Sequence, residues 1–276
     1  MSPGSVLDPE LGDHVCLPLR GEGERRAAAR LFTLNGLRRR AKVLLITHAD
    51  SPGLTREWLE PMVPGFAAAE SSGRIEILDG AGTHFTDGRL DPGKALGGLA
   101  AAVELAGKQG CRGLYALVDA SWGACDPPGQ VALESAANAL FGRHRMALVC
   151  QYDRRVFTRE AVERAASAHP ITPGQAALRY AAPGGAAALR LWGDVDLTNR
   201  QAFASVLEPL REEPGEVVID AAGLAFADAG SAQLLVAMAV RRPPGRTVVV
   251  CGARLARLLQ LIKGDEVVTV RRVGDV

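Results

Sequence analysis

The sequence lacks an excess of charge of either sign. Its 276 residues carry a net charge of +1 at pH 7, and basic and acidic residues are balanced on both sides of Pro170. Proteins that bind nucleic acid or anionic membranes concentrate Lys and Arg on one segment or face, because contacts with phosphate supply much of the affinity. We therefore expect neither nucleic acid nor a membrane as a partner.

The N-terminus lacks a signal peptide, and the chain has few cysteines. The first ten residues contain neither a basic region nor an apolar run. The five cysteines are scattered and odd in number, which does not suit a disulfide framework and is typical of a reducing compartment. Residues 221–240 are nearly uncharged, but Asp228 and Gln233 would be costly in hydrocarbon. We expect a cytoplasmic protein.

The sequence also lacks the motifs of common enzyme classes. A phosphate-binding loop needs Gly-x-x-x-x-Gly-Lys-[Ser/Thr], because its amides and lysine surround the phosphates. At the matching strand-to-helix junction, residues 19–25 read Leu-Arg-Gly-Glu-Gly-Glu-Arg, and Glu22 and Glu24 would repel a triphosphate. There is no Gly-x-Ser-x-Gly elbow and no thiol-enzyme signature. We expect that the protein is not an enzyme.

Apolar runs alternate with segments of helical period along the whole chain, which is typical of α/β folds with parallel strands. The length suits two domains, and the prolines at 170 and 173 mark a junction, so we assign residues 1–172 and 173–276 to them. In the first domain we expect strands at 15–19, 42–47, 74–78, 114–119 and 146–152, and helices at 22–40, 54–69, 92–109, 128–141 and 158–168. In the second we expect strands at 177–180, 188–192, 216–220, 246–251 and 267–270, and helices at 198–210, 229–241 and 254–263.

Residues 11–170 contain several short motifs in a characteristic order. They are Gly-Asp-His-Val-Cys at 12–16, Gly-Leu-Arg-Arg at 36–39, Ala-Ser-Trp at 120–122, and Leu-Val-Cys-Gln-Tyr-Asp at 148–153 before His169-Pro170. This segment resembles the MEDS domain, a sensory module related in fold to RecA- and KaiC-like ATPases. The resemblance implies a RecA-like, mostly parallel sheet with flanking helices, and a role in sensing a small molecule such as a hydrocarbon derivative.

His14 and Cys16 alternate along one expected strand and therefore face the same side. With Cys150 or His169 nearby they could bind a metal or haem. However, His-x-Cys is a weak metal signal, and the chain has no Cys-x-x-Cys motif. We therefore expect no metal and no cofactor, but a small-molecule pocket that is mainly apolar with a few polar groups. Its lining residues would be His14, Cys16, Trp122, Cys150, Tyr152 and His169.

The second domain contains three short motifs. Residues 189–196 read Leu-Arg-Leu-Trp-Gly-Asp-Val-Asp, residues 216–220 read Glu-Val-Val-Ile-Asp, and residues 226–228 read Phe-Ala-Asp. Residues 177–276 resemble the STAS family of anti-sigma-factor antagonists, whose signature loop follows a strand ending in Asp. The resemblance implies a smaller α/β domain that docks on an anti-sigma factor or a related serine kinase. Its partner-binding residues would be Asp196, Asp228, Gly230 and Ser231.

In the STAS family, phosphorylation of a serine in the signature loop breaks the complex, since phosphate adds nearly two negative charges. Here the acceptor position falls on Gly230, and Ser231 stands where the family has glycine. If Asp228 caps the helix, Ser231 is its third residue, where the hydroxyl can bond the backbone. Phosphorylation of Ser231 therefore requires a shift in helix register.

Together these features predict a cytoplasmic signalling regulator in which a sensory domain controls what a STAS domain binds. The partner would be an anti-sigma factor or related serine kinase, and a homodimer is compatible with the sequence. Two alternatives stay open. The first domain could be a nucleotide- or thiol-dependent enzyme with an accessory STAS domain, or the protein could be a constitutive binding scaffold.

Overall fold

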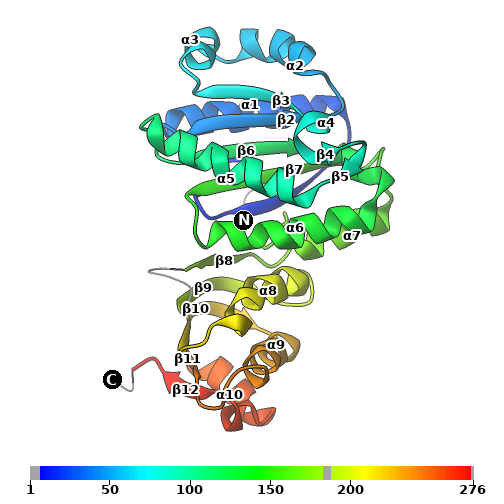
Figure 1. Ribbon diagram of the computed structural model, residues 1–276. Helices are drawn as coiled ribbons and strands as arrows, with labels where there is room; N and C mark the ends of the chain where they lie inside the picture. Colours follow the sequence, from blue (N-terminus) through cyan, green and yellow to red (C-terminus); the bar gives the residue numbers. More distant parts are fainter. Residues whose placement is uncertain (1–6, 183–187, 275–276) are drawn as a thin grey trace.

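The computed structural model describes residues 7–182 and 188–274, which form two α/β units, one below the other in Figure 1. The first unit has five parallel strands, as the sequence predicts, and the structure orders them β1-β7-β6-β2-β3. These strands are β1 (His14–Leu19), β2 (Lys42–Thr47), β3 (Ile75–Asp79), β6 (Leu114–Asp119) and β7 (Met146–Asp153). The main helices are α1 (Glu22–Arg38), α2 (Pro52–Leu59), α3 (Phe66–Ser71), α5 (Pro92–Lys108), α6 (Pro127–Phe141) and α7 (Arg159–Ala168).

Both faces of this sheet are covered, so every residue of β2, β6 and β7 is buried. That burial explains why these strands read as continuous apolar runs and not as alternating patterns. Helices α1, α2 and α3 contribute Phe32, Leu59 and Phe66 to one apolar cluster. Helices α5, α6 and α7 cover the other face.

The second unit has a mixed sheet in the order β12-β11-β10-β9-β8, parallel except for β8 against β9. Its strands are β8 (Leu178–Ala181), β9 (Ala188–Val195), β10 (Val217–Ala227), β11 (Thr247–Cys251) and β12 (Thr269–Arg272). Its helices are α8 (Arg200–Leu207), α9 (Ala229–Val240) and α10 (Ala253–Leu261). Helix α8 packs on α9, and α9 packs on α10.

Three sequence predictions need correction. The helix expected at 54–69 is two helices, α2 and α3, because Pro61 and Pro64 interrupt the segment between them. Residues 79–91, to which the sequence assigns neither a strand nor a helix, contain α4 (Gly80–His84) and the hairpin β4 (Phe85–Thr86) with β5 (Arg89–Leu90). The short loop expected before Asp228 belongs to β10. This strand pairs with β9 as far as Ala227. Two register shifts interrupt its alternation of inward and outward side chains, so the sequence pattern does not show the strand.

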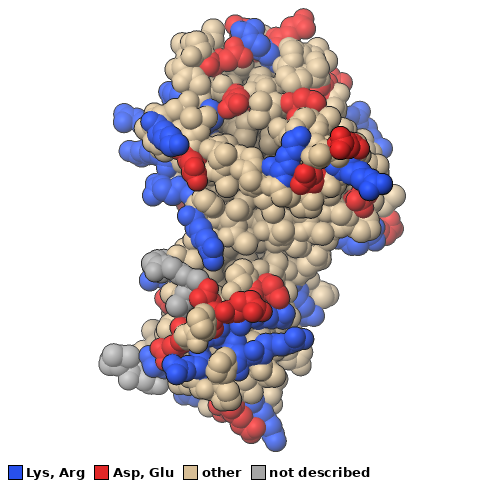
Figure 2. Space-filling view, in the orientation of Figure 1, with Lys and Arg blue, Asp and Glu red and all other residues tan. Residues whose placement is uncertain are grey.

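The two units are packed together. One apolar cluster includes Phe141 of α6, Tyr180 of β8 and Val206 of α8, and α8 lies against α6 and α7 (Figure 1). The guanidinium of Arg179 in β8 donates to both carboxylate oxygens of Asp13, at 2.7 and 3.0 Å. Figure 2 shows basic and acidic side chains on both units, without one sign covering this face. Among the described residues, no helix has the length and apolar character needed to cross a membrane.

Gly193 gives the first testable prediction, because it holds β9 close to the start of β8. Its φ is +92°, and a Cβ there would collide with the carbonyl oxygen of Ala177. We expect Gly193→Ala to lower the free energy of unfolding by about 1–3 kcal/mol. Gly174→Ala is the matched control, because Gly174 also has a positive φ (+76°) but has open space around the new Cβ. Urea denaturation should find Gly193→Ala the less stable variant, and equal stabilities would contradict the proposed collision.

Candidate functional site

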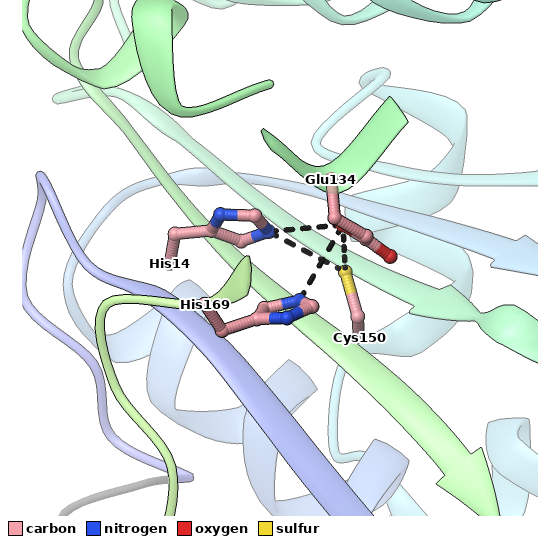
Figure 3. Close-up of side chains that lie close together, drawn as sticks. All are labelled: His14, Glu134, Cys150 and His169. Carbon is pink, nitrogen blue, oxygen red and sulfur yellow. Dashed lines mark hydrogen bonds and ion pairs between the residues drawn. The ribbon is translucent and has the colours of Figure 1, made fainter. Parts of the chain in front are cut away.

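Four polar side chains from distant parts of the chain meet inside the first unit (Figure 3). They are His14 at the start of β1, Glu134 on α6, Cys150 on β7 and His169 directly after α7, and we call them the buried cluster. Their ligand atoms all lie within 4.8 Å of one another, and all four residues are buried. The sheet brings β1 beside β7, with His14 paired to Leu148, while α6 and α7 lie over the same face.

Glu134 is at the centre of the buried cluster. Its Oε2 lies 3.2 Å from Nε2 of His14, 3.4 Å from Nε2 of His169 and 3.5 Å from Sγ of Cys150. Its other oxygen, Oε1, accepts a 2.6 Å hydrogen bond from the hydroxyl of Tyr152. The carboxylate is therefore contacted on both oxygens although it is shielded from water.

The second nitrogen of each imidazole fixes its tautomer. Nδ1 of His169 lies 2.7 Å from the carbonyl oxygen of Ala165, which can only accept, so this nitrogen carries a proton. Nδ1 of His14 lies 2.8 Å from Oδ1 of Asn138. The amide of Asn138 is oriented by donation from Nδ2 to the carbonyl oxygen of Ala168, so Oδ1 accepts from His14. Both Nε2 atoms thus face Glu134.

Burial controls the ionisation of the surrounding groups. Burial lowers the pKa of His14, and the neighbouring His169 lowers it further. Burial also raises the pKa of the Cys150 thiol well above its ordinary value, and the charge of Glu134 adds to this effect. The same two causes raise the pKa of Tyr152. Near neutral pH these groups are uncharged, and His14 keeps a lone pair on Nε2.

The structure brings together five of the six predicted pocket residues: His14, Cys16, Cys150, Tyr152 and His169. Cys16 is buried two residues along β1 from His14, and burial raises its pKa. Trp122 does not join them. It lies in a separate apolar cluster and stacks on His84 with ring centroids 4.9 Å apart. The grouping of Trp122 with the other five residues is therefore wrong, and ligand binding by those five stays a prediction.

Sequence reasoning missed Glu134 and Asn138. Both lie on the buried side of α6, where Gln130, Glu134 and Asn138 follow at intervals of four residues. Polar side chains in line on an otherwise apolar helix face must find partners inside the protein. That spacing was the available signal, but it does not identify the partners.

Asn138 also links the buried cluster to the second unit. Its Nδ2 donates to Oγ of Ser205 on α8 at 2.9 Å, and its backbone carbonyl accepts a 2.6 Å hydrogen bond from the hydroxyl of Tyr180. A further contact joins Gln201 of α8 to Ser135 of α6 at 3.1 Å. A displacement of α6 would therefore change the hydrogen bonds that α8 makes with it.

A cavity of about 320 Å³ lies at the same junction. Asn138 and Leu140 come from the first unit, while Leu189, Val206 and Leu210 come from the second. The exposed lining is mainly apolar, with a few polar groups, as in small-molecule sites. Any molecule that enters this cavity contacts both units.

The predicted partner-binding residues gather at one end of the second sheet. Asp228 caps α9: its Oδ1 accepts from the amide and from the hydroxyl of Ser231, both at 2.7 Å. Its Oδ2 accepts from Nη2 of Arg200, the first residue of α8, at 2.8 Å. Asp196 lies nearby, because Val195 at the end of β9 pairs with Ala227 at the end of β10. Hydrogen bonds from Ser231 and Arg200 therefore hold the carboxylate of Asp228 in place.

Ser231 is buried, and Gly230 beside it is half-buried. A Cβ on Gly230 would touch the guanidinium of Arg200, so the position suits glycine while the Arg200–Asp228 pair is formed. Ser231 is 1% exposed, and its hydroxyl is used in the cap. A kinase has no access to this hydroxyl unless the start of α9 opens. The geometry therefore favours the interpretation of Ser231 as a capping residue.

Two large apolar side chains are exposed beside this loop. Leu197 is 70% exposed and Phe226 is 50% exposed. Leu197 follows Asp196, and Phe226 precedes Asp228 by two residues. Sequence reasoning did not select either of them, although exposed apolar groups next to charges are typical of a protein-binding surface.

The turn between β1 and α1 is the place where a RecA-like domain would bind phosphate. Glu24 accepts from the backbone amide of Arg20 at 2.7 Å, and Glu22 pairs with Arg26 within α1. Both carboxylates thus lie at the helix N-terminus, as the sequence predicts. Glu22 is compensated there by Arg26, and the guanidinium of Arg155 lies beside Gly21 of the same turn.

Comparison with known families agrees with both units. Residues 13–170, more than half of the chain, match the MEDS family, the methanogen/methylotroph, DcmR sensory domain. The chain belongs to the MEDS family. Residues 178–269, after the MEDS domain, match a STAS domain model with the description "Mlab, STAS domain". Both resemblances seen in the sequence, and their order, are confirmed.

One similar solved structure is a KaiC-like protein from the hyperthermophilic archaeon Pyrococcus horikoshii. The two share 11% sequence identity over 62% of this chain and 72% of that chain, with a TM-score of 0.42. No curated protein matches the sequence.

The cap of α9 in the STAS domain generates the second prediction. Burial by itself would raise the pKa of Asp228, but its bonds from Ser231 and Arg200 outweigh burial and lower it. We expect Asp228→Ala to lower the free energy of unfolding at pH 7 by about 1 kcal/mol. Because the folded-state pKa lies below the unfolded one, this difference is full above the unfolded pKa and disappears as pH falls through the folded pKa.

Urea denaturation of both proteins at pH 7 and at acid pH measures this difference. Asp265→Ala, at an exposed acidic residue of the same domain, is the control and should change stability little at either pH. Equal stability of wild type and Asp228→Ala at pH 7 would argue against the cap.

Proposed function

We propose that this protein is a cytoplasmic signalling regulator and not an enzyme. In this proposal the state of the MEDS domain controls how the STAS domain binds an anti-sigma factor or a related serine kinase. The family matches support a sensory and anti-sigma-antagonist-like regulator in general terms. Beyond that general role, we propose who the partner is and that the MEDS domain controls its binding.

The observation that carries this proposal is that α8 contacts Asp228 directly and reaches the buried cluster through Asn138. Ser205 on α8 accepts from Asn138, which also accepts from His14 of the buried cluster. At the start of the same helix, Arg200 holds Asp228 at 2.8 Å. A short helix moves largely as one body, so a shift at Ser205 changes the geometry at Arg200.

The exposed residues at the end of the STAS sheet support protein docking there. Leu197 and Phe226 offer apolar area, while Asp196 and Asp228 offer negative charge beside it. An apolar centre with charges around it is the usual arrangement of a specific interface. A partner with a basic rim around an apolar patch would be complementary.

The junction cavity supports small-molecule control. A ligand between Asn138 and Val206 would have different contacts in a closed and an open arrangement of the two domains. Such a difference in affinity is what a ligand needs in order to shift a conformational equilibrium. The proposal that the MEDS domain is not an ATPase is supported by the turn between β1 and α1, where residues 19–25 lack the Gly-x-x-x-x-Gly-Lys-[Ser/Thr] motif.

The third prediction concerns partner binding. The full chain is used as bait in a cytoplasmic extract of its own organism, as wild type, as Asp228→Lys and as Asp265→Lys. We expect wild type and Asp265→Lys to retain the same protein, identified by mass spectrometry as an anti-sigma factor or serine kinase. Asp228→Lys should retain at least about tenfold less, equivalent to about 1.4 kcal/mol of binding free energy.

Asp265 is a suitable control, because it is an exposed aspartate of the same domain in the turn after α10. A partner retained equally by Asp228→Lys would show that docking does not use this loop. If the retained proteins are unrelated to sigma-factor control, the proposed partner class is wrong. Co-purified small molecules are identified from the same samples.

A further inference from the structure

The buried cluster has the composition of a metal site. It offers two imidazoles, one thiol and one carboxylate, from four different parts of the fold. We propose that Nε2 of His14, Oε2 of Glu134, Sγ of Cys150 and Nε2 of His169 bind one divalent transition-metal ion, with Zn²⁺ as the best fit. The sequence predicted no metal because only the His14-x-Cys16 pair was visible in it.

The spacing of the donor atoms fits a tetrahedral ion. Bonds of about 2.0–2.1 Å to nitrogen and oxygen and about 2.3 Å to sulfur place tetrahedral ligands about 3.3–3.6 Å apart. Four of the six separations are 3.2, 3.4, 3.5 and 3.8 Å. The remaining two, from His169 to His14 and to Cys150, are within 4.8 Å. This spacing is too tight for a porphyrin.

The second nitrogen of each histidine is already bonded in the way that metal ligands require. Ligating histidines usually donate their other ring N–H to a carbonyl, which aims the remaining lone pair at the metal. Nδ1 of His14 donates to Asn138, and Nδ1 of His169 donates to the carbonyl oxygen of Ala165. The hydroxyl of Tyr152 orients the carboxylate of Glu134 by donating to Oε1, the oxygen that would not bind the ion.

His169 provides an independent indication of a missing ligand. Its side chain is fully buried, and its Nε2 has no hydrogen-bond partner among the described residues. This nitrogen points into the buried cluster (Figure 3). A buried polar atom left without a partner costs free energy, and a metal ion at the centre would satisfy it.

Charge balance favours a dication. Coordination would displace the proton of Cys150 and leave a thiolate, which with the Glu134 carboxylate gives two negative charges beside two neutral imidazoles. A divalent ion neutralises this set. The mixture of sulfur, nitrogen and oxygen donors suits Zn²⁺ or Co²⁺ and not Mg²⁺ or Ca²⁺, which prefer oxygen alone. Four protein ligands leave no open position, as in structural zinc sites.

The ion would join β1, α6, β7 and the end of α7, and Asn138 would transmit their position to Ser205 of α8. Its role in signalling rests on the proposed function, whereas metal binding itself does not. Loss of the ion would release α6 and α7 from each other beside the STAS domain. The occupancy of this site would then be an input that reaches the Asp228 loop.

The fourth prediction tests metal binding with the full chain and added Co²⁺ or Zn²⁺. Wild type should retain one equivalent of either ion after gel filtration, measured by mass spectrometry of the metal. The Co²⁺ form should show thiolate-to-metal charge-transfer absorption in the near ultraviolet. Cys150→Ala should lose that absorption, and Asn138→Ala should weaken Zn²⁺ binding about 10–100-fold by freeing Nδ1 of His14.

Two matched controls remove other buried donors. Cys251→Ala changes a buried cysteine of the STAS domain, and His84→Gln changes a buried histidine that stacks on Trp122. Both should keep the metal and its spectrum, and circular dichroism checks that every variant is folded. The wild-type spectrum remains decisive if Cys150→Ala does not fold.

The inference is overturned if wild type retains no ion, or if folded Cys150→Ala keeps the charge-transfer absorption. Neither result would affect partner capture by the Asp228 loop, so failure of the metal site is distinguishable from failure of the proposed function. Conversely, a chain that binds Zn²⁺ but captures no partner would support this inference alone.

Discussion

A carboxylate as deeply buried as that of Glu134 needs partners for both of its oxygens, and several elements of the MEDS domain supply side chains that converge on it. Two imidazoles, a thiol and a tyrosine hydroxyl converge on its two oxygens. They come from β1, β7 and the end of α7, which are far apart in the sequence. Removing the donor hydroxyl of Tyr152 or the donor thiol of Cys150 would leave a buried carboxylate oxygen without its hydrogen bond, which costs free energy. The requirement therefore fixes α6 against the sheet and α7 beside it.

The same constraint extends into the STAS domain. Asn138 supports His14 with one end of its amide and Ser205 with the other. Helix α8 then carries Arg200 to Asp228, which also caps α9. The MEDS and STAS domains are thus linked by polar contacts at two places on α8, in addition to the apolar cluster that both units contribute to. These contacts distinguish the arrangement from two domains joined only by a linker.

The sequence was sufficient for the two α/β units, the parallel sheet and the Asp228 cap, because these depend on local periodicity and on short motifs. It was not sufficient for features created by tertiary pairing. The extension of β10 to Ala227 depends on bulges against β9, which no alternation pattern reveals. Trp122 was grouped with His14 because its motif suggested a pocket, but in the fold its ring stacks on His84. Glu134 was missed because a single glutamate in a helix gives no sign of its partners.

We propose that the buried cluster and the Asp228 loop are physically coupled through α8. Hydrogen–deuterium exchange of the full chain, compared between wild type and Glu134→Gln, tests it most directly. Coupling predicts faster amide exchange in α6 and α7 and also in α8 and at Ser231, although the substituted residue lies in the other domain. Faster exchange confined to the MEDS domain, with α8 and α9 unchanged, would contradict the claim.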